Sequence, residues 1–249
     1  MKKICVFLCL ISFGVMGQSN IRFTHPDVLD VLKGNYNPSD YSASNIIHDR
    51  NSIVSGVIAG VNADSLKKTL EHLDTFYTRN TGSDTLSATK GIGAARTWIH
   101  QKFTEYSIQN ENRLLVGYLQ FDYNACGQNR HKNVAAILPG SDPDRQEIVL
   151  VEAHYDSRCE QSCDTSCYAP GMEDNGSGTA LVMELARVMA PYTYDRTIVF
   201  TVTTGEEQGL LGGEAWSDYI DDNDIPFLAC LNNDVIGGII CGENSSPPS

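Results

Sequence analysis

Apolar residues between residues 64 and 103 recur with the spacing of a helix. One set, at i, i+4, i+7 and i+11, comprises Leu66, Leu70, Leu73 and Tyr77. A second set comprises Ile92, Ala95, Ile99 and Phe103. Residues at such spacings share one face of an α-helix. We therefore expect two amphipathic helices here, each with one face turned toward a core.

The residues that follow alternate between strand-like and helix-like runs. Five apolar stretches are expected to form strands: residues 114–121, 133–138, 147–153, 197–203 and 227–232. Two stretches with helical spacing lie between them, at residues 177–190 and 210–220. Strands that alternate with helices are typical of a largely parallel sheet covered on both faces. We therefore predict an α/β fold, a three-layer α/β/α sandwich around a mostly parallel, mixed sheet.

The N-terminal residues have the features of an export signal. Lys2 and Lys3 precede an apolar run that is shorter than a membrane helix needs, and small residues follow it near Gly17. We interpret residues 1–17 as a cleaved signal peptide, which predicts a secreted or periplasmic protein with no membrane span after cleavage. Residues 18–61 are polar and predict an irregular N-terminal arm, with a removable pro-segment as the alternative, followed by one α/β domain over residues 62–249.

The net charge of the chain disfavours some classes of binding partner. Its 249 residues include 31 acidic and 18 basic side chains, a formal net charge of −13. Such an acidic surface repels nucleic acid and anionic lipid, so we expect no nucleic-acid partner. Bound divalent cations would offset part of this charge.

The cysteines favour disulfide bonds. Six lie outside the predicted signal peptide: Cys126, Cys159, Cys163, Cys167, Cys230 and Cys241. An even number in an exported chain indicates disulfides, although the sequence does not select the pairing. The C-x3-C-x3-C spacing of residues 159–167 also fits a soft-metal clip, which an oxidising compartment disfavours.

The stretch "VEAHYDSRCE" ends a buried strand on an imidazole and a carboxylate. Residues i and i+2 of a strand point to the same face, so His154 and Asp156 can face one cavity while Tyr155 packs on the other side. Ligands of α/β sheets gather beyond the carboxyl ends of the strands. His154 lies at such an end.

Acidic residues occupy three further places of the same kind. Asp174 lies in a glycine-rich loop before a helix, Glu206 and Glu207 follow one strand, and Asp234 follows the next. Taken singly, these residues also fit a helix cap, a solvated loop and a turn. Taken together on one rim, four carboxylates and an imidazole would repel one another and lose hydration unless a cation lay among them.

The ligand types indicate which metal and which chemistry. Imidazole nitrogen with carboxylate oxygen suits zinc, with manganese or cobalt as alternatives. One carboxylate can bridge two such ions that activate a water molecule for hydrolysis. Adjacent glutamates can divide the remaining work, one as a ligand and the other as general base.

Four segments carry a family resemblance: "AHYDS", "MEDNGSGTALVMELAR", "TGEEQGLLGG" and "LNNDVIGG". In this order and spacing they resemble the co-catalytic di-zinc aminopeptidases, whose wider family includes plasma glutamate carboxypeptidase, glutaminyl cyclase and the transferrin-receptor ectodomain. Weaker similarity, including "TRNTGS" at residues 78–83, reaches back to about residue 62.

The resemblance implies a role for each site residue. His154 and Asp234 would hold one zinc ion, Asp174 would bridge both ions, and Glu207 would hold the second. Glu206 would be the general base, and Asp156 would orient His154. The resemblance also implies a cis peptide between Asp174 and Asn175.

The same resemblance implies a secreted zinc aminopeptidase that acts on peptides with a free N-terminus. Two alternatives stay open: an acyltransferase like glutaminyl cyclase with a single zinc ion, and a non-catalytic binding ectodomain of the same fold. The family completes its second zinc site with a later histidine, and no histidine follows His154. We therefore expect the domain to be truncated, with its C-terminal part missing.

Overall fold

The computed structural model describes residues 17–237. Residues 1–16 of the predicted signal peptide lie outside this range, and Cys241 lies outside it as well. None of the helices in the described range combines the length and the apolar character that crossing a membrane requires.

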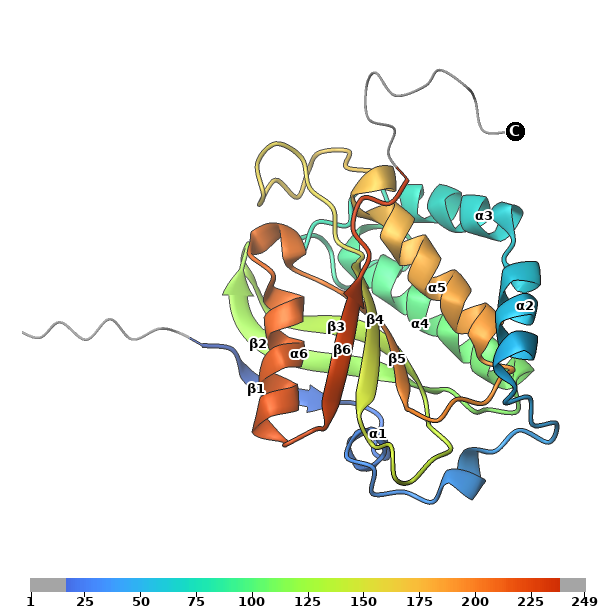
Figure 1. Ribbon diagram of the computed structural model, residues 1–249. Coiled ribbons are helices and arrows are strands. Elements are labelled where there is room, and N and C mark those ends of the chain that lie inside the picture. Colours follow the sequence, from blue (N-terminus) through green and yellow to red (C-terminus); the bar gives the residue numbers. More distant parts are fainter. Residues whose placement is uncertain (1–16, 238–249) are drawn as a thin grey trace, which may run out of the picture.

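A six-stranded sheet forms the centre of the molecule, with the strand order β1-β2-β3-β5-β4-β6 (Figure 1). The strands are β1 (Ser19–Phe23), β2 (Leu115–Ala125), β3 (Gln128–Leu138), β4 (Ile148–His154), β5 (Ile198–Thr203) and β6 (Phe227–Asn232). β4 runs parallel to β5 and β6, and the other three pairings are antiparallel. The predicted mixed sheet is confirmed.

Parallel pairing is less extensive than the sequence pattern indicated. β2 and β3 form one long hairpin, with the chain reversing at Cys126 and Gly127, both at positive φ (48° and 83°). β1 adds a further antiparallel strand on the outer side of β2. Only the part of the sheet built from β4, β5 and β6 therefore has the strand–helix–strand connections that enforce parallel pairing.

Helices cover both faces of the sheet (Figure 1). The first face is covered by α3 (Ala63–Asp74), α4 (Gly91–Gln109) and α5 (Gly178–Met189), which enclose one apolar core. The second face is covered by α1 (Val28–Leu32) and α6 (Leu211–Asp222), which enclose another. The predicted α/β/α sandwich is confirmed. Both helices expected between residues 64 and 103 are present, but α3 ends at Asp74, so Tyr77, at a φ of 69°, does not share its apolar face as expected.

The N-terminal arm is more regular than predicted. Besides β1 and α1, residues 18–61 contain a 3₁₀ turn, η1 (Pro38–Tyr41), and an eleven-residue helix, α2 (Arg50–Gly60). The sequence of α2 lacks the apolar stripe of an amphipathic helix, and none of its residues is fully buried in the structure. A side-chain cap starts it instead, because Asp49 accepts a hydrogen bond from the backbone N–H of Ser52 at 2.9 Å.

Disulfides fix the loops at one end of the sheet. Cys126 pairs with Cys163, and Cys159 pairs with Cys167. The soft-metal clip considered for residues 159–167 is therefore excluded, because all three of its cysteines are oxidised. Cys230 forms no disulfide within residues 17–237.

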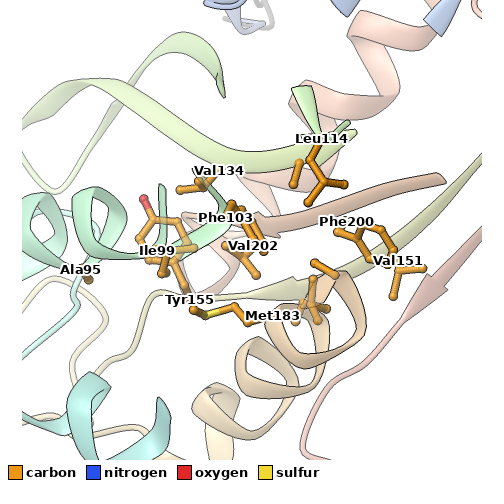
Figure 2. Packing of buried hydrophobic residues seen from close by; sticks show 14 of the residues in the cluster. Ala95, Ile99, Phe103, Leu114, Val134, Val151, Tyr155, Met183, Phe200 and Val202 are labelled. Atoms are coloured by element: carbon orange, nitrogen blue, oxygen red, sulfur yellow. The ribbon is translucent and has the colours of Figure 1, made fainter. Parts of the chain in front are cut away.

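The parallel strands bring their carboxyl ends to a common edge. His154 at the end of β4 pairs with Thr203 at the end of β5. Beyond β6, the backbone N–H of Asn233 donates to the carbonyl of Glu152 at 2.9 Å. Tyr155 turns to the opposite face and is fully buried among residues of α4 and α5 such as Ile99 and Met183 (Figure 2). The residues that follow each strand therefore meet beside His154.

Candidate metal centre

The two nitrogens of the His154 ring have different surroundings. The side chain is only 3% exposed. Its Nδ1 lies 3.2 Å from the backbone carbonyl of Asp156 and 3.5 Å from its Oδ1. Its Nε2 is buried without a hydrogen-bond partner among the described residues. With a proton on Nδ1 directed at Asp156, Nε2 faces the rim of the sheet, where a metal cation can take the place of its proton.

Three carboxylates surround this free nitrogen. His154 Nε2 lies 3.1 Å from Asp174 Oδ1, 3.4 Å from Asp234 Oδ1 and 3.9 Å from Glu206 Oε2. One ligand atom from each of His154, Asp174 and Asp234 lies within 4.8 Å of the others. The structure thus brings three of the four predicted ligands together, with the predicted general base beside them.

Asp156 connects the segments that carry these groups. Its side chain is fully buried and receives backbone N–H bonds from both Glu206 and Glu207 at 3.3 Å. Thr81 donates its hydroxyl to the same carboxylate at 3.2 Å. Asp156 therefore holds the His154 ring through its backbone carbonyl, with its carboxylate 3.5 Å away, and the same carboxylate holds the turn that presents the two glutamates, η3 (Glu206–Gln208).

The Asp174 loop is tied to the end of β6. It is a kinked turn, η2 (Met172–Ser177), whose backbone is not helical at Asp174 and Asn175. The turn leads directly into α5 and contains the cis peptide expected between these two residues. The buried amide of Asn175 donates to the carbonyl of Asn233 at 2.9 Å. Since Asn233 precedes Asp234, this bond sets the separation of two of the carboxylates.

Glu207 lies apart from the cluster. Its carboxylate is 8% exposed, and Oε2 accepts a hydrogen bond from Arg158 Nε at 2.5 Å. Arg158 precedes the short loop closed by the Cys159–Cys167 disulfide. Sequence reasoning missed Arg158, although it directly follows the quoted "AHYDS" segment. The fourth predicted ligand is therefore paired with a cation of the chain itself.

The carboxylates of the cluster shift the pKa values of the groups beside them. Burial lowers the pKa of His154, but Asp156, Glu206 and Asp234 outweigh it and raise the pKa to about 9. Burial raises the pKa of Glu206, and the nearby Asp156 raises it further. These directions are what crowded carboxylates produce when a proton on the imidazole is their main compensation.

A divalent cation fits this donor set better than the proton does. The orphaned Nε2 atom and the two aspartate oxygens form one nitrogen and two oxygen ligands around a common point. Zinc accepts such a set and leaves a further position for water or substrate. The residues that would hold it are His154, Asp174 and Asp234.

Comparison with known proteins agrees with this chemistry. Residues 133–239 match the model of Peptidase family M28. A "Probable zinc metalloprotease" of Pyrenophora teres f. teres (strain 0-1) is 36% identical over 200 residues, which cover 77% of this chain and 42% of that protein. The chain spans less than half the length of this protein and of other curated relatives with the same description.

Solved structures share the fold. The Legionella pneumophila LapA aminopeptidase has a TM-score of 0.61 at 21% identity, over 78% of this chain and 48% of that one. The Bacteroides thetaiotaomicron glutaminyl cyclase has a TM-score of 0.54 at 18% identity, over 71% and 63%. At these identities the similarity concerns the fold alone, so the two neighbours do not decide between hydrolysis and cyclisation.

Proposed function

Because this chain belongs to peptidase family M28, we propose that it carries the metal centre of a secreted zinc aminopeptidase. The substrate would be a peptide with a free N-terminus, and the reaction hydrolysis of its first peptide bond. Two disulfides and the signal-like N-terminal residues support export.

One observation carries the proposal. The buried Nε2 of His154 has no hydrogen-bond partner in the described part of the chain, yet it faces Asp174 Oδ1 at 3.1 Å and Asp234 Oδ1 at 3.4 Å. A buried polar atom without a partner is costly, and the partly exposed carboxylates that converge on it repel one another. A bound zinc ion removes both costs at once.

The protein groups around the ion divide the remaining work. When bound, zinc polarises the substrate carbonyl and acidifies a water molecule. Glu206, whose Oε2 lies 3.9 Å from His154 Nε2, would accept the proton of the attacking water and pass it to the leaving amine. Asp156 would keep the His154 ring oriented and hold the backbone of Glu206 in place.

Glu207 is assigned to the second zinc ion. Its Oε2 is bonded to Arg158, so only Oε1 is free to face a cation unless the ion pair opens. Asp174, whose side chain is 55% exposed, would bridge the two positions.

The Arg158–Glu207 pair also supports a second candidate function. If the pair persists, the ligand set is that of one ion, as in a single-zinc acyltransferase of the glutaminyl-cyclase kind. The non-catalytic ectodomain is the third candidate, and the ligand set His154, Asp174 and Asp234 speaks against it.

Metal content and turnover separate these functions. The complete gene product should hydrolyse aminoacyl arylamides, lose this activity when zinc is chelated and regain it when zinc is restored. About two zinc ions per chain are expected for the aminopeptidase, one for the acyltransferase and none for the binding ectodomain. Cyclisation of N-terminal glutamine without arylamide hydrolysis would replace the proposal with the second candidate.

A further inference from the structure

A fully buried arginine lies behind the metal centre. Arg79 is 0% exposed, and its guanidinium donates only to backbone carbonyls. Nε donates to Tyr155 at 2.7 Å, Nη1 to Pro170 at 2.5 Å and to Leu73 at 3.3 Å, and Nη2 to Gly171 at 2.9 Å. Within residues 17–237, no carboxylate lies within ion-pair distance of this side chain.

A buried cation without a direct counter-ion is costly for the fold. Burial lowers the pKa of Arg79 to about 10, so the group stays charged at neutral pH. The charges that act on it most are those of Asp156, Asp74 and Asp174. Two of these three carboxylates belong to the metal centre, so the arginine balances charge there at a distance.

The bonds of Arg79 join the two segments that carry the cluster. Tyr155 lies between His154 and Asp156, so the bond to its carbonyl holds the end of β4. Gly171 directly precedes the loop that holds Asp174. Arg79 therefore spans both sides of the site with one rigid, planar group.

Local packing makes this geometry tight. The backbone N–H of Arg79 donates to Ser157 Oγ at 3.1 Å, and Ser157 N–H donates back to the carbonyl of Arg79 at 3.3 Å. A Cβ atom at Gly171 would lie 3.0 Å from Arg79 Nη2 and 2.6 Å from Ser157 Cβ. The loop backbone at Gly171 therefore lies directly against the guanidinium.

We propose that Arg79 is a positioning residue for the metal centre, which keeps the His154 strand end and the Asp174 loop at ligand spacing before the cation binds. It also supplies a fixed positive charge that lets the carboxylates converge in the metal-free protein. This inference rests on the proposed zinc site and adds a requirement to it. Residues that orient metal ligands typically change metal affinity about 10–100-fold when replaced.

Arg113 offers a matched control. It is also buried, at 4% exposure, and donates only to carbonyls: to Tyr41 at 2.9 Å, to Ala190 at 2.8 Å and to Tyr192 at 3.1 Å. These bonds join the N-terminal arm to the end of α5, away from the ligands. Replacing either arginine removes the same kind of fold-stabilising bonds, but only Arg79 touches the site.

The experiment compares Arg79→Lys, Arg79→Gln, Arg113→Lys and Arg113→Gln in the purified chain. Zinc affinity is measured by competition with a chromophoric chelator, and the ligand field by the absorption spectrum of the Co²⁺-substituted protein. Hydrogen exchange of residues 169–176 is followed in the metal-free state, and unfolding is followed in parallel. Lysine keeps the positive charge but lacks the planar guanidinium with its several N–H donors, whereas glutamine removes the charge.

The Arg79 variants should bind zinc about 10–100-fold more weakly, alter the Co²⁺ spectrum and exchange faster at residues 169–176. The Arg113 variants should lose stability while zinc affinity and spectrum stay at the wild-type values. If Arg79→Lys folds with wild-type zinc affinity, or if both arginines affect affinity equally, the positioning role is overturned while the zinc site stands. A wild-type chain that binds no zinc overturns both.

Discussion

The imidazole of His154 and the carboxylate of Asp156 lie side by side at the end of one buried strand, with Nδ1 and Oδ1 3.5 Å apart. The carboxylate also receives the backbone N–H groups of Glu206 and Glu207. Asp156 therefore orients both the predicted zinc ligand His154 and the turn that carries the two glutamates.

Asp156→Asn should weaken zinc binding without removing a ligand. The amide keeps the size of the carboxylate but loses its charge and one acceptor. The glutamate turn is then less well held and the negative charge beside Nδ1 is gone, while the backbone carbonyl bond to Nδ1 remains. We expect zinc affinity about 10–100-fold lower in a chelator competition. Thr81→Val, which removes only the 3.2 Å hydroxyl bond to Asp156, serves as the milder control. Wild-type affinity in Asp156→Asn would remove this role.

The adjacent glutamates should behave differently when each is replaced by glutamine. In the complete gene product, Glu206→Gln should preserve zinc content while kcat falls by at least about 10²–10⁴-fold, the usual contribution of a general base. Glu207→Gln should lower zinc occupancy together with activity. Equal loss of zinc in both variants, or near wild-type turnover in Glu206→Gln, would show that base and ligand are wrongly assigned.

The two disulfides should contribute unequally to stability. Cys126 and Cys163 are 37 residues apart, whereas Cys159 and Cys167 are 8 apart. In the chain-entropy account, the longer closed loop stabilises by about 4 kcal/mol and the shorter by about 2.5 kcal/mol. Guanidinium unfolding of the Cys126→Ser/Cys163→Ser and Cys159→Ser/Cys167→Ser proteins measures both losses. A larger loss for the short loop would contradict the entropic account.

Acid should destabilise the fold partly through His131. This side chain is 3% exposed, and burial is the main cause of its lowered pKa. Below the ordinary pKa of about 6.5, the unfolded chain binds a proton that the folded chain does not. Stability is therefore fully present above that pH and is lost as pH falls through it. Unfolding curves at several pH values should show a smaller decline in His131→Asn; an unchanged slope would exclude His131 as the cause.

The helices and the site strands could be predicted because apolar periodicity records burial. α3 and α4 each turn an apolar face to the first core, and β4 and β5 each begin with a run of apolar residues because both faces of the sheet are covered there. α2 could not be predicted in this way, because none of its residues is fully buried and its sequence carries no apolar periodicity. The sequence predicts two shorter strands in place of the β2–β3 hairpin, because the turn at Cys126 and Gly127 carries no common hairpin sequence.

The acidic residues of the site could be predicted because each follows a strand or precedes a helix at the carboxyl edge of the sheet. Arg79 and Arg158 could not be predicted in the same way. The bonds of Arg79 reach carbonyls up to 92 residues away, and any residue type offers such a carbonyl. The contact between Arg158 and Glu207 depends on how the disulfide-closed loop folds back, which no local pattern records.

Zinc titration of the purified chain tests the central claim most directly. Wild type, Asp174→Asn, Asp234→Asn and Asp221→Asn are compared by chelator competition and metal analysis, with Asp221 on the exposed face of α6 as the charge-matched control. The account predicts at least one zinc ion per wild-type chain, affinity unchanged in Asp221→Asn, and about 10-fold or greater loss in the two site variants. A wild-type chain without zinc, or site variants that bind it as tightly as Asp221→Asn, would contradict the assignment of His154, Asp174 and Asp234 as the metal centre.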